Sequence, residues 1–518
     1  MQKKSFYLTT PIYYVNSVPH LGTAYTTLAA DALARFRRMA GDDVLFLTGL
    51  DEHGQKVEEA ALAHDMEPKA WVDSLAKEFL DTWEMLDISN DKFIRTTDEY
   101  HEHAVQHLAQ TLYDNGDIYK GTYEGWYCVP DETYWASSDI DEDHICPDCG
   151  RALQFVKEEN YFFKLSAYQD KLLEYFDAHP DFIGPDARKN EVLSFVKGGL
   201  KDLSISRSNI KWGVELPWDS SHTMYVWFDA LINYLSAAGY GQEGGEAEFA
   251  HRWPAQVHFV GKDIIRFHCV IWPAMLMAAG IELPERIYAH GFLLTKGEKM
   301  SKSKGNAQTP ASLVETFGVD GYRYYFLRDV AFGQDGSISM ESMVQRYNGD
   351  LANDWGNLCS RLFNMIGKYF EGSVPDPSGC VDADEGKELK TIAAGLFDAY
   401  ESHMAAFDFA GALDKTWDLI KEANKYIELS APWALAKDEA QSGRLAAVLY
   451  NALEAVRIAA MYTAPVMPNT SAEVWHRLGL GDISTVDDIA ALTEWGQLAV
   501  GNTVEKGDPL FPRMVDEK

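Results

Sequence analysis

Runs of apolar residues divide the first part of the chain into predicted strands and helices. Residues 5–10 and 44–49 are short apolar runs that predict buried strands, and the alanine-rich stretch 20–39 predicts a helix between them. Strands that alternate with helices favour an α/β fold with a doubly wound parallel sheet. Two later runs, 257–261 and 286–290, predict further strands of the same sheet.

The pattern changes twice further along the chain. From about 116 to 221, Tyr, Trp, Gly and acidic residues surround two cysteine-containing turns, which we interpret as an insertion. After 347, apolar residues recur at helical spacing over 392–407, 410–429 and 443–463, which predicts a separate helical domain. These changes predict boundaries that give the segments 1–115, 116–221, 222–290, 291–346 and 347–518.

Length and composition restrict the class of protein. A chain of 518 residues exceeds a single core, so two to four domains are expected. No run approaches the roughly 20 apolar residues of a membrane helix, and no signal-peptide segment precedes the first strand, so we expect a cytoplasmic protein. Six cysteines in so long a chain do not make a disulfide framework.

The stretch 296–305, KGEKMSKSKG, places four lysines within ten residues of a chain whose formal net charge is −33. Glycines at both sides allow a ligand to approach closely, and two serines leave the lysine tips unobstructed. A Lys-rich run is more often a solvated surface loop. The alternative is a loop that binds phosphate, and a second feature favours it.

That second feature is the turn between the first strand and the first helix. The N-terminus of a helix presents N–H groups and a positive dipole end to phosphate. Gly22 leaves room for a purine ring, and His20 can donate a hydrogen bond to a phosphate oxygen. Together with the distant lysine loop, this turn predicts a nucleotide-binding site.

Two short motifs and three longer strings carry a resemblance to a known family. Residues 20–23, HLGT, resemble the HIGH signature of class I aminoacyl-tRNA synthetases, and 299–303, KMSKS, match their second signature. With TGLDEHGQ at 48–55, YVWFDA at 225–230 and GKDIIRFH at 261–268, the whole chain resembles the methionyl-tRNA synthetase family. Thr23 replaces the second signature histidine, whose hydrogen bond to ATP is then weakened, replaced by the hydroxyl or supplied elsewhere.

The resemblance implies a fold and a reaction. Segments 1–115 and 222–290 would form the two halves of a Rossmann-type catalytic domain, and 116–221 a connective insertion with zinc-knuckle-like turns. Segment 291–346 would contain the KMSKS loop and a stem-contact region, and 347–518 would be an α-helical anticodon-binding domain. The implied enzyme is a methionine–tRNA ligase. It activates L-methionine with ATP and Mg²⁺ to methionyl-adenylate and pyrophosphate, and then transfers methionine to the 3′-terminal adenosine of initiator and elongator tRNA(Met).

The family pattern also implies roles for individual residues. His20, Lys299 and Lys302 would be catalytic, and ATP would be bound by His20, Gly22, Thr23, Asp263, Lys299 and Lys302. Asp51 would pair with the methionine ammonium. The remaining pocket residues would be Ile12, Tyr14, Trp227, Ala230, Leu231, Tyr234, Ile264 and His268. Without the resemblance, each of these apolar or aromatic residues would more often belong to the hydrophobic core. Tyr14 and His268 also offer polar groups to the thioether sulfur.

The cysteine turns of the insertion predict a structural metal site. Cys146 and Cys149 form a knuckle in which two thiolates share one tetrahedral ion. Cys128 and Asp131 have the same spacing upstream and complete a set of four ligands, with His144 as a rival for the fourth position. We expect one structural Zn²⁺; the alternative is a knuckle that kept its shape without the metal.

In the helical domain, Asn357, Arg361 and Trp433 match the family's anticodon-binding positions. The amide and guanidinium can bind base edges and the indole can stack an unpaired base, as is common for single-stranded RNA loops. A tryptophan after a proline is otherwise a helix-packing residue. Because the chain stops soon after Phe511, without the C-terminal dimerisation domain of some relatives, we expect a monomer.

Two rival functions follow from the same residues. The first is a synthetase for isoleucine, valine, leucine or cysteine, and the short insertion argues against the first three because it leaves no room for a large editing domain. The second is a nucleotidyltransferase, or a tRNA-binding regulator that lost catalysis. The intact signature residues argue against lost activity, and the helical domain argues against a small-molecule nucleotidyltransferase.

Overall fold

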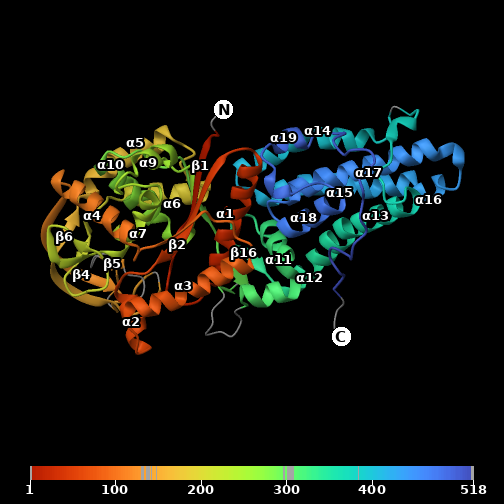
Figure 1. Cartoon of the computed structure of the whole chain (residues 1–518). Helices are drawn as coiled ribbons and strands as arrows, with labels where there is room; N and C mark the ends of the chain where they lie inside the picture. The colour runs from red at the N-terminus through yellow and green to blue at the C-terminus, as the bar shows by residue number, and fades with distance from the viewer. Residues whose placement is uncertain are drawn as a thin grey trace.

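The computed structural model describes residues 3–129, 133–135, 140–141, 143–147, 149–295, 298–299, 308–382 and 384–514. Figure 1 shows two parts side by side, an α/β part that contains β1, β2 and β4–β6 and a long group of helices that includes α13–α15 and α17–α19. The long helices of the second part run roughly along the length of the molecule.

A six-stranded sheet forms the centre of the α/β part. Its order is β3-β2-β1-β12-β13-β7, and every neighbouring pair is parallel. The strands are β1 (Ser5–Tyr14), β2 (Asp43–Asp51), β3 (Lys92–Arg95), β7 (Ile183–Gly184), β12 (Val257–Gly261) and β13 (Ile287–His290). The predicted doubly wound sheet is therefore confirmed.

The first strand runs further than the sequence pattern predicts. It continues through Pro11 to Tyr14, where the sequence suggested an irregular turn, with a register shift between Thr9 and Ile12. Proline has no N–H to donate to the ladder, so the shift falls where the hydrogen bonding is interrupted. After the shift Tyr14 lies opposite Asp51 on β2, so the two side chains belong to the same edge of the sheet.

Helices cover the sheet and follow its strands. They are α1 (Leu21–Met39), α2 (Gln55–Ala63), α3 (Pro68–Met85), α4 (Glu99–Asp114), α7 (Val226–Leu231), α8 (Asn233–Ala237), α9 (Glu246–Arg252), α10 (Trp272–Ala279) and α11 (Pro310–Asp329). The strand order reverses between β1 and β12. Ligands of open parallel sheets bind at such a point, beyond the carboxyl ends of the strands.

The segment 116–221 contains a sheet of its own. Its long hairpin pairs β4 (Ile118–Cys128) with β6 (Gln154–Phe163), flanked by β5 (Thr133–Trp135) and β8 (Leu203–Ser204). A smaller sheet combines β9 (Ser206–Arg207), β10 (Glu215–Leu216) and β11 (Asp219–Met224). Between β6 and β8, α5 (Gln169–Ala178), β7 and α6 (Asp186–Lys197) return the chain to the edge of the main sheet. The proposed domain boundaries remain predictions.

The second part is helical, as predicted. It contains α12 (Met340–Arg346), a π-helical turn (Tyr347–Gly356), α13 (Asn357–Tyr369), α14 (Lys387–Ala405), α15 (Phe409–Ser430), α16 (Pro432–Leu435), α17 (Ser442–Thr463), α18 (Pro468–Arg477) and α19 (Ile489–Leu492). Among the described residues one helix, Glu439–Thr463, is long and apolar enough to cross a membrane, and its apolar window is fully buried. Its composition is that of a helix surrounded by others.

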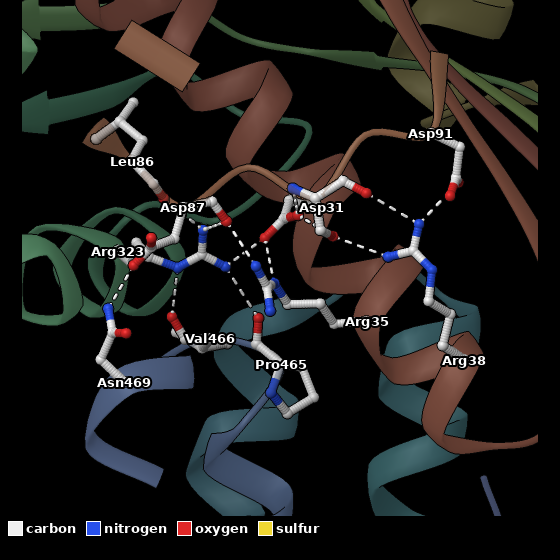
Figure 2. Close-up of polar contacts among 11 residues, drawn as sticks. Asp31, Arg35, Arg38, Leu86, Asp87, Asp91, Arg323, Pro465, Val466 and Asn469 are labelled. Atoms are coloured by element: carbon white, nitrogen blue, oxygen red, sulfur yellow. Dashed lines mark hydrogen bonds and ion pairs between the residues drawn. The ribbon is translucent and has the colours of Figure 1, made fainter. Parts of the chain in front are cut away.

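A buried arginine joins the two parts. Figure 2 shows Arg323 of α11 between α1 and the turn after α17. Its guanidinium donates to Asp31 Oδ2 at 2.6 Å and to the carbonyl oxygens of Val466 at 2.7 Å, Leu86 at 2.9 Å and Pro465 at 3.1 Å. The side chains of Arg323 and Asp31 have no exposed surface. The ion pair joins α1, the helix that begins the nucleotide site, to α11, and the hydrogen bonds to Pro465 and Val466 join α11 to the helical part.

Candidate functional site

His20 caps the helix that follows the first strand. Its Nδ1 accepts hydrogen bonds from the N–H groups of Gly22 at 3.0 Å and Thr23 at 3.3 Å. Because Nδ1 is the acceptor, the neutral ring carries its proton on Nε2, as a phosphate donor must. A Cβ at Gly22 would lie 2.9 Å from the imidazole, so glycine makes room for the capping ring. The first N–H groups of this helix are thus used by His20, whereas the sequence suggested that they face phosphate.

Thr23 completes the same cap. Its hydroxyl accepts from the N–H of His20 at 3.0 Å and donates to the carbonyl of His20 at 2.7 Å. A hydroxyl has one proton to give, so in this conformation none is left for a phosphate oxygen. Thr23 therefore supports the position of His20. For its hydroxyl to donate to ATP in place of the second signature histidine, this cap would have to open.

The other predicted nucleotide residues lie across the reversal point of the sheet. Asp263 is exposed in the short 3₁₀ turn Lys262–Ile264, directly after β12, and no side chain caps that turn. The backbone of Lys299 lies in β15 (Glu298–Lys299), which pairs with β14 (Leu293–Thr295), and β14 also pairs with β16 (Gly336–Ile338). The side chain of Lys299 and the whole of Lys302 lie outside the described residues.

The predicted methionine residues lie on four segments of the chain, and contacts join Tyr234 and Trp227 to His268 and pair Tyr14 with Asp51. They come from β1, from the end of β2, from α7–α8 and from the turn and π-helix after β12. Leu231 and Tyr234 are buried in one hydrophobic cluster, and the partly buried residues packed against it include Ile12, Tyr14, Trp227 and Ile264. Ala230 and His268 are also buried.

The polar end of this group is formed by Asp51 and Tyr14. Asp51 ends β2 and is only 5% exposed. The hydroxyl of Tyr14 donates to the carbonyl oxygen of His53 at 3.1 Å. A buried carboxylate is suited to pair with an ammonium group, because burial strengthens the attraction between the charges.

The thioether end contains a neutral histidine. Burial lowers the pKa of His268 to about 4, although a hydrogen bond to the Ile264 carbonyl works in the opposite direction. The carbonyl can only accept, so Nδ1 of His268 donates to it, at 3.0 Å, and Nε2 accepts from the hydroxyl of Tyr234 at 2.8 Å. Both nitrogens are thus used within the protein, and the His268 ring is uncharged at neutral pH.

Trp227 lies at the partly exposed side of this group. Its indole stacks on Phe267, with ring centroids 3.9 Å apart and an interplanar angle of 10°. The same indole meets His268 edge to face at 6.5 Å. Ring edges and faces of this kind are favourable neighbours for a thioether sulfur.

Three thiols of the insertion lie together. The sulfur atoms of Cys128, Cys146 and Cys149 are within 4.8 Å of one another, and Cys128 and Cys149 are 3.5 Å apart. A tetrahedral zinc ion with Zn–S distances of about 2.3 Å spaces its sulfurs about 3.8 Å apart, so these thiols fit zinc. His144, the rival ligand, is not in this group; its ring stacks on Trp126 at 3.8 Å. Asp131 lies outside the described residues.

The predicted anticodon residues lie on one face of the helical part. Asn357 and Arg361 are one turn apart on α13, and the Arg361 guanidinium lies 5.9 Å from the ring centre of Trp433. Trp433 is 41% exposed, which is unusual for so large an apolar side chain. Ala431, in the left-handed region at the end of α15, turns the chain so that α16 presents the indole. Arg361 is also paired with Glu428 at 2.5 Å.

Two family models cover nearly the whole chain. One, described as class I tRNA synthetases (M), matches residues 6–156 and 143–363, and the other, the anticodon-binding domain of methionyl tRNA ligase, matches residues 374–518. The chain belongs to the methionyl-tRNA synthetase family. The resemblance inferred from the two signatures is confirmed, and the protein is a class I aminoacyl-tRNA synthetase with methionine–tRNA ligase activity.

Individual members of the methionyl-tRNA synthetase family match along the full chain. The methionine–tRNA ligase of Caldanaerobacter subterraneus subsp. tengcongensis is 51% identical over 100% of this chain and 80% of its own length. That of Streptomyces coelicolor is 47% identical over 99% of this chain and 97% of its own. The structure of the Mycobacterium tuberculosis enzyme in complex with methionyl-adenylate is 45% identical, with a TM-score of 0.94 over 98% of this chain and 100% of that one.

The structure adds one cluster to the site that the sequence did not single out. Asp229 of α7 lies between two histidines, with Oδ2 2.7 Å from Nδ1 of His53 and Oδ1 2.9 Å from Nε2 of His101. His53 and Asp229 stand in two of the strings that carry the resemblance to the methionyl-tRNA synthetase family. Sequence alone gives no sign that they meet, because 176 positions separate them.

Proposed function

We propose that the enzyme joins methionine to tRNA(Met) in two steps at the carboxyl edge of the six-stranded sheet. The observation that carries this proposal is that the buried Asp51 carboxylate lies opposite Tyr14 where β1 and β2 end, and that the chain runs from there into the helix capped by His20. The methionine carboxylate attacks the α-phosphate of ATP, pyrophosphate leaves, and the aminoacyl group then passes to a ribose hydroxyl of tRNA. Little covalent chemistry is required of the protein, so positioning and charge stabilisation supply the rate.

Methionine is bound at its two ends. Asp51 pairs with the ammonium, and the side chain extends between Trp227, Leu231 and Tyr234. His268 keeps this pocket uncharged, because its pKa of about 4 leaves the ring neutral at working pH. An uncharged pocket of buried aromatic rings favours a polarizable thioether and disfavours charged side chains.

ATP is bound on the other side of the reversal point. His20 donates Nε2–H to a phosphate oxygen, Gly22 and Thr23 hold the capping turn, and Asp263 accepts hydrogen bonds from the ribose hydroxyls. Lys299 and Lys302, whose side chains lie outside the described residues, supply positive charge to the leaving pyrophosphate. ATP enters as its magnesium complex, and the ion neutralises phosphate charge.

The anticodon and the acceptor end of tRNA are bound by different parts of the chain. Asn357 and Arg361 contact anticodon bases, and Trp433 stacks on one of them. Cys128, Cys146 and Cys149 hold a structural zinc ion, with Asp131 as the fourth ligand, which keeps the insertion folded beside the catalytic sheet. We also propose that the enzyme is a monomer and acts in the cytoplasm; light scattering after size-exclusion chromatography and fractionation of cells test these points.

The first experiment is ATP–pyrophosphate exchange with each of the twenty amino acids and no tRNA. Exchange with methionine alone supports the pocket assignment, whereas exchange with another amino acid overturns it. Aminoacylation of a tRNA(Met) transcript, compared with the same transcript carrying a changed anticodon, then tests the anticodon contacts. Equal charging of both transcripts would contradict them.

A further inference from the structure

The two ends of the methionine site belong to segments that are far apart in the sequence. Asp51 and Tyr14 lie at the ends of β2 and β1, whereas Trp227, Ala230 and Leu231 all lie on α7. An amino acid that bridges the two ends is bound well only when their separation is fixed beforehand. A residue that joins the two segments therefore bears on affinity without touching the ligand.

Asp229 is such a residue. It is on α7 with the pocket residues, its side chain is 1% exposed, and each carboxylate oxygen faces one imidazole, His53 at 2.7 Å and His101 at 2.9 Å. Burial by itself would raise the pKa of Asp229, but His53 and His101 outweigh it and bring the pKa to about 2. The ionised carboxylate can only accept, so both imidazoles donate to it.

His53 transmits this contact to the ammonium end. It lies two residues after Asp51, and its carbonyl oxygen receives the hydroxyl of Tyr14. Trp212 packs edge-on against the imidazole, with ring centroids 5.6 Å apart, and its indole N–H donates to the carbonyl oxygen of Glu52 at 2.5 Å. Movement of His53 would therefore move the segment that carries Asp51.

Two further carboxylates lie around the cluster, one facing His53 and one paired with an arginine. Nε2 of His53 is 3.9 Å from the carboxylate of Glu102 on α4, and Glu52 is paired with Arg95 at 2.6 Å. On the far side, Nδ1 of His101 is 2.9 Å from the hydroxyl of Ser236 on α8. The cluster thus connects the loop after β2 with α4, α7 and α8.

We propose that Asp229 is a positioning residue for methionine, which fixes the distance between the Asp51 carboxylate and the pocket wall on α7 through its hydrogen bond to His53. The inference rests on the proposed function of the pocket. It assigns no chemical step to Asp229. Loss of the carboxylate is expected to weaken methionine binding and to leave ATP binding almost unchanged, since His20 and Asp263 lie on other segments.

The test compares D229N, H53A and H53N with the wild-type enzyme in methionine-dependent ATP–pyrophosphate exchange. D229N keeps the side-chain volume and one acceptor oxygen, but it places an NH2 group against one of the two imidazoles that donate. We expect its KM for methionine to rise about tenfold, with KM for ATP within about twofold of wild type. H53A should behave like D229N, whereas H53N, whose amide nitrogen can replace Nδ1 as the donor, should stay within about threefold of wild type.

A matched control separates positioning from general loss of stability. Asp31 is a second buried, paired carboxylate with a pKa of about 2. Its partners, Arg35, Ser89 and Arg323, are not among the predicted pocket residues, so D31N should lower the melting temperature without raising KM for methionine. An unchanged KM for methionine in D229N overturns the inference, and so do equal KM values in H53A and H53N. If D229N does not fold, the comparison of H53A with H53N tests the inference by itself. No exchange with methionine by the wild-type enzyme would instead contradict the proposed function.

Discussion

Replacement of Arg323 tests the junction between the catalytic and helical parts. R323M keeps the length of the side chain but removes all five of its N–H donors. The structure then loses the ion pair with Asp31 and the hydrogen bonds to the carbonyl oxygens of Val466, Leu86 and Pro465 (Figure 2). Asp31 keeps Arg35, at 2.7 Å, and the N–H and hydroxyl of Ser89, at 2.7 and 2.6 Å.

The expected loss in the free energy of unfolding of R323M follows from the burial of the ion pair. Removing one partner of a buried ion pair costs about 3–5 kcal/mol, because the other charge stays buried. Burial would raise the pKa of Asp31, but Arg35, Arg323 and Ser89 outweigh it and lower the pKa from 3.8 to about 2, a net stabilisation of the charged form of about 2.5 kcal/mol. Since Arg35 and Ser89 remain, we expect R323M to lower the free energy of unfolding by about 3 kcal/mol.

The assay must resolve the two parts, since a multidomain chain does not unfold in one step. Urea denaturation followed by circular dichroism gives the overall change, and hydrogen exchange measured by mass spectrometry locates it. We expect faster exchange in the segments around 86–89 and 463–469 in R323M. The double variant D31N/R323M should be more stable than the sum of the single changes predicts, by about 1–3 kcal/mol. A loss below about 0.5 kcal/mol in R323M would refute the reasoning.

Three further predictions address the site. Replacing Lys302 by alanine should slow adenylate formation at least about a hundredfold with little change in methionine affinity, measured by single-turnover kinetics and calorimetry; an unchanged rate removes its role. W433A should raise KM for tRNA(Met) about tenfold or more and leave tRNA-independent exchange intact, since stacking on one base is worth about 1–3 kcal/mol; loss of both activities would indicate misfolding. Because the folded-state pKa of His268, about 4, is below the ordinary 6.5, the unfolded chain binds the additional proton and stability falls as pH drops from about 6.5 to about 4. H268Q should therefore lose about 2 kcal/mol less than wild type between pH 7 and pH 5 in urea denaturation, and an equal loss in both would contradict the assignment.

Much of the fold was predictable because local pattern and global packing agree. The strand 257–261 has the predicted limits, and 44–49 and 286–290 lie within or overlap observed strands. The helices predicted at 392–407, 410–429 and 443–463 form as α14, α15 and α17. Apolar runs bounded by polar residues determine such elements locally. The continuation of the first strand through Pro11 was not predictable, since a neighbouring strand, and not local preference, holds that segment extended.

The sequence by itself determined the family, the two signatures, the thiol turns and the residue types expected in the pocket, because each can be recognised in short strings of neighbouring residues. Only the tertiary structure decided how distant groups meet. It places Asp229 between His53 and His101, directs both nitrogens of His268 to internal partners, and buries Arg323 between the two parts. Side-chain distance, burial and the resulting pKa shifts arise from packing between remote segments, and no periodicity or motif contains that information.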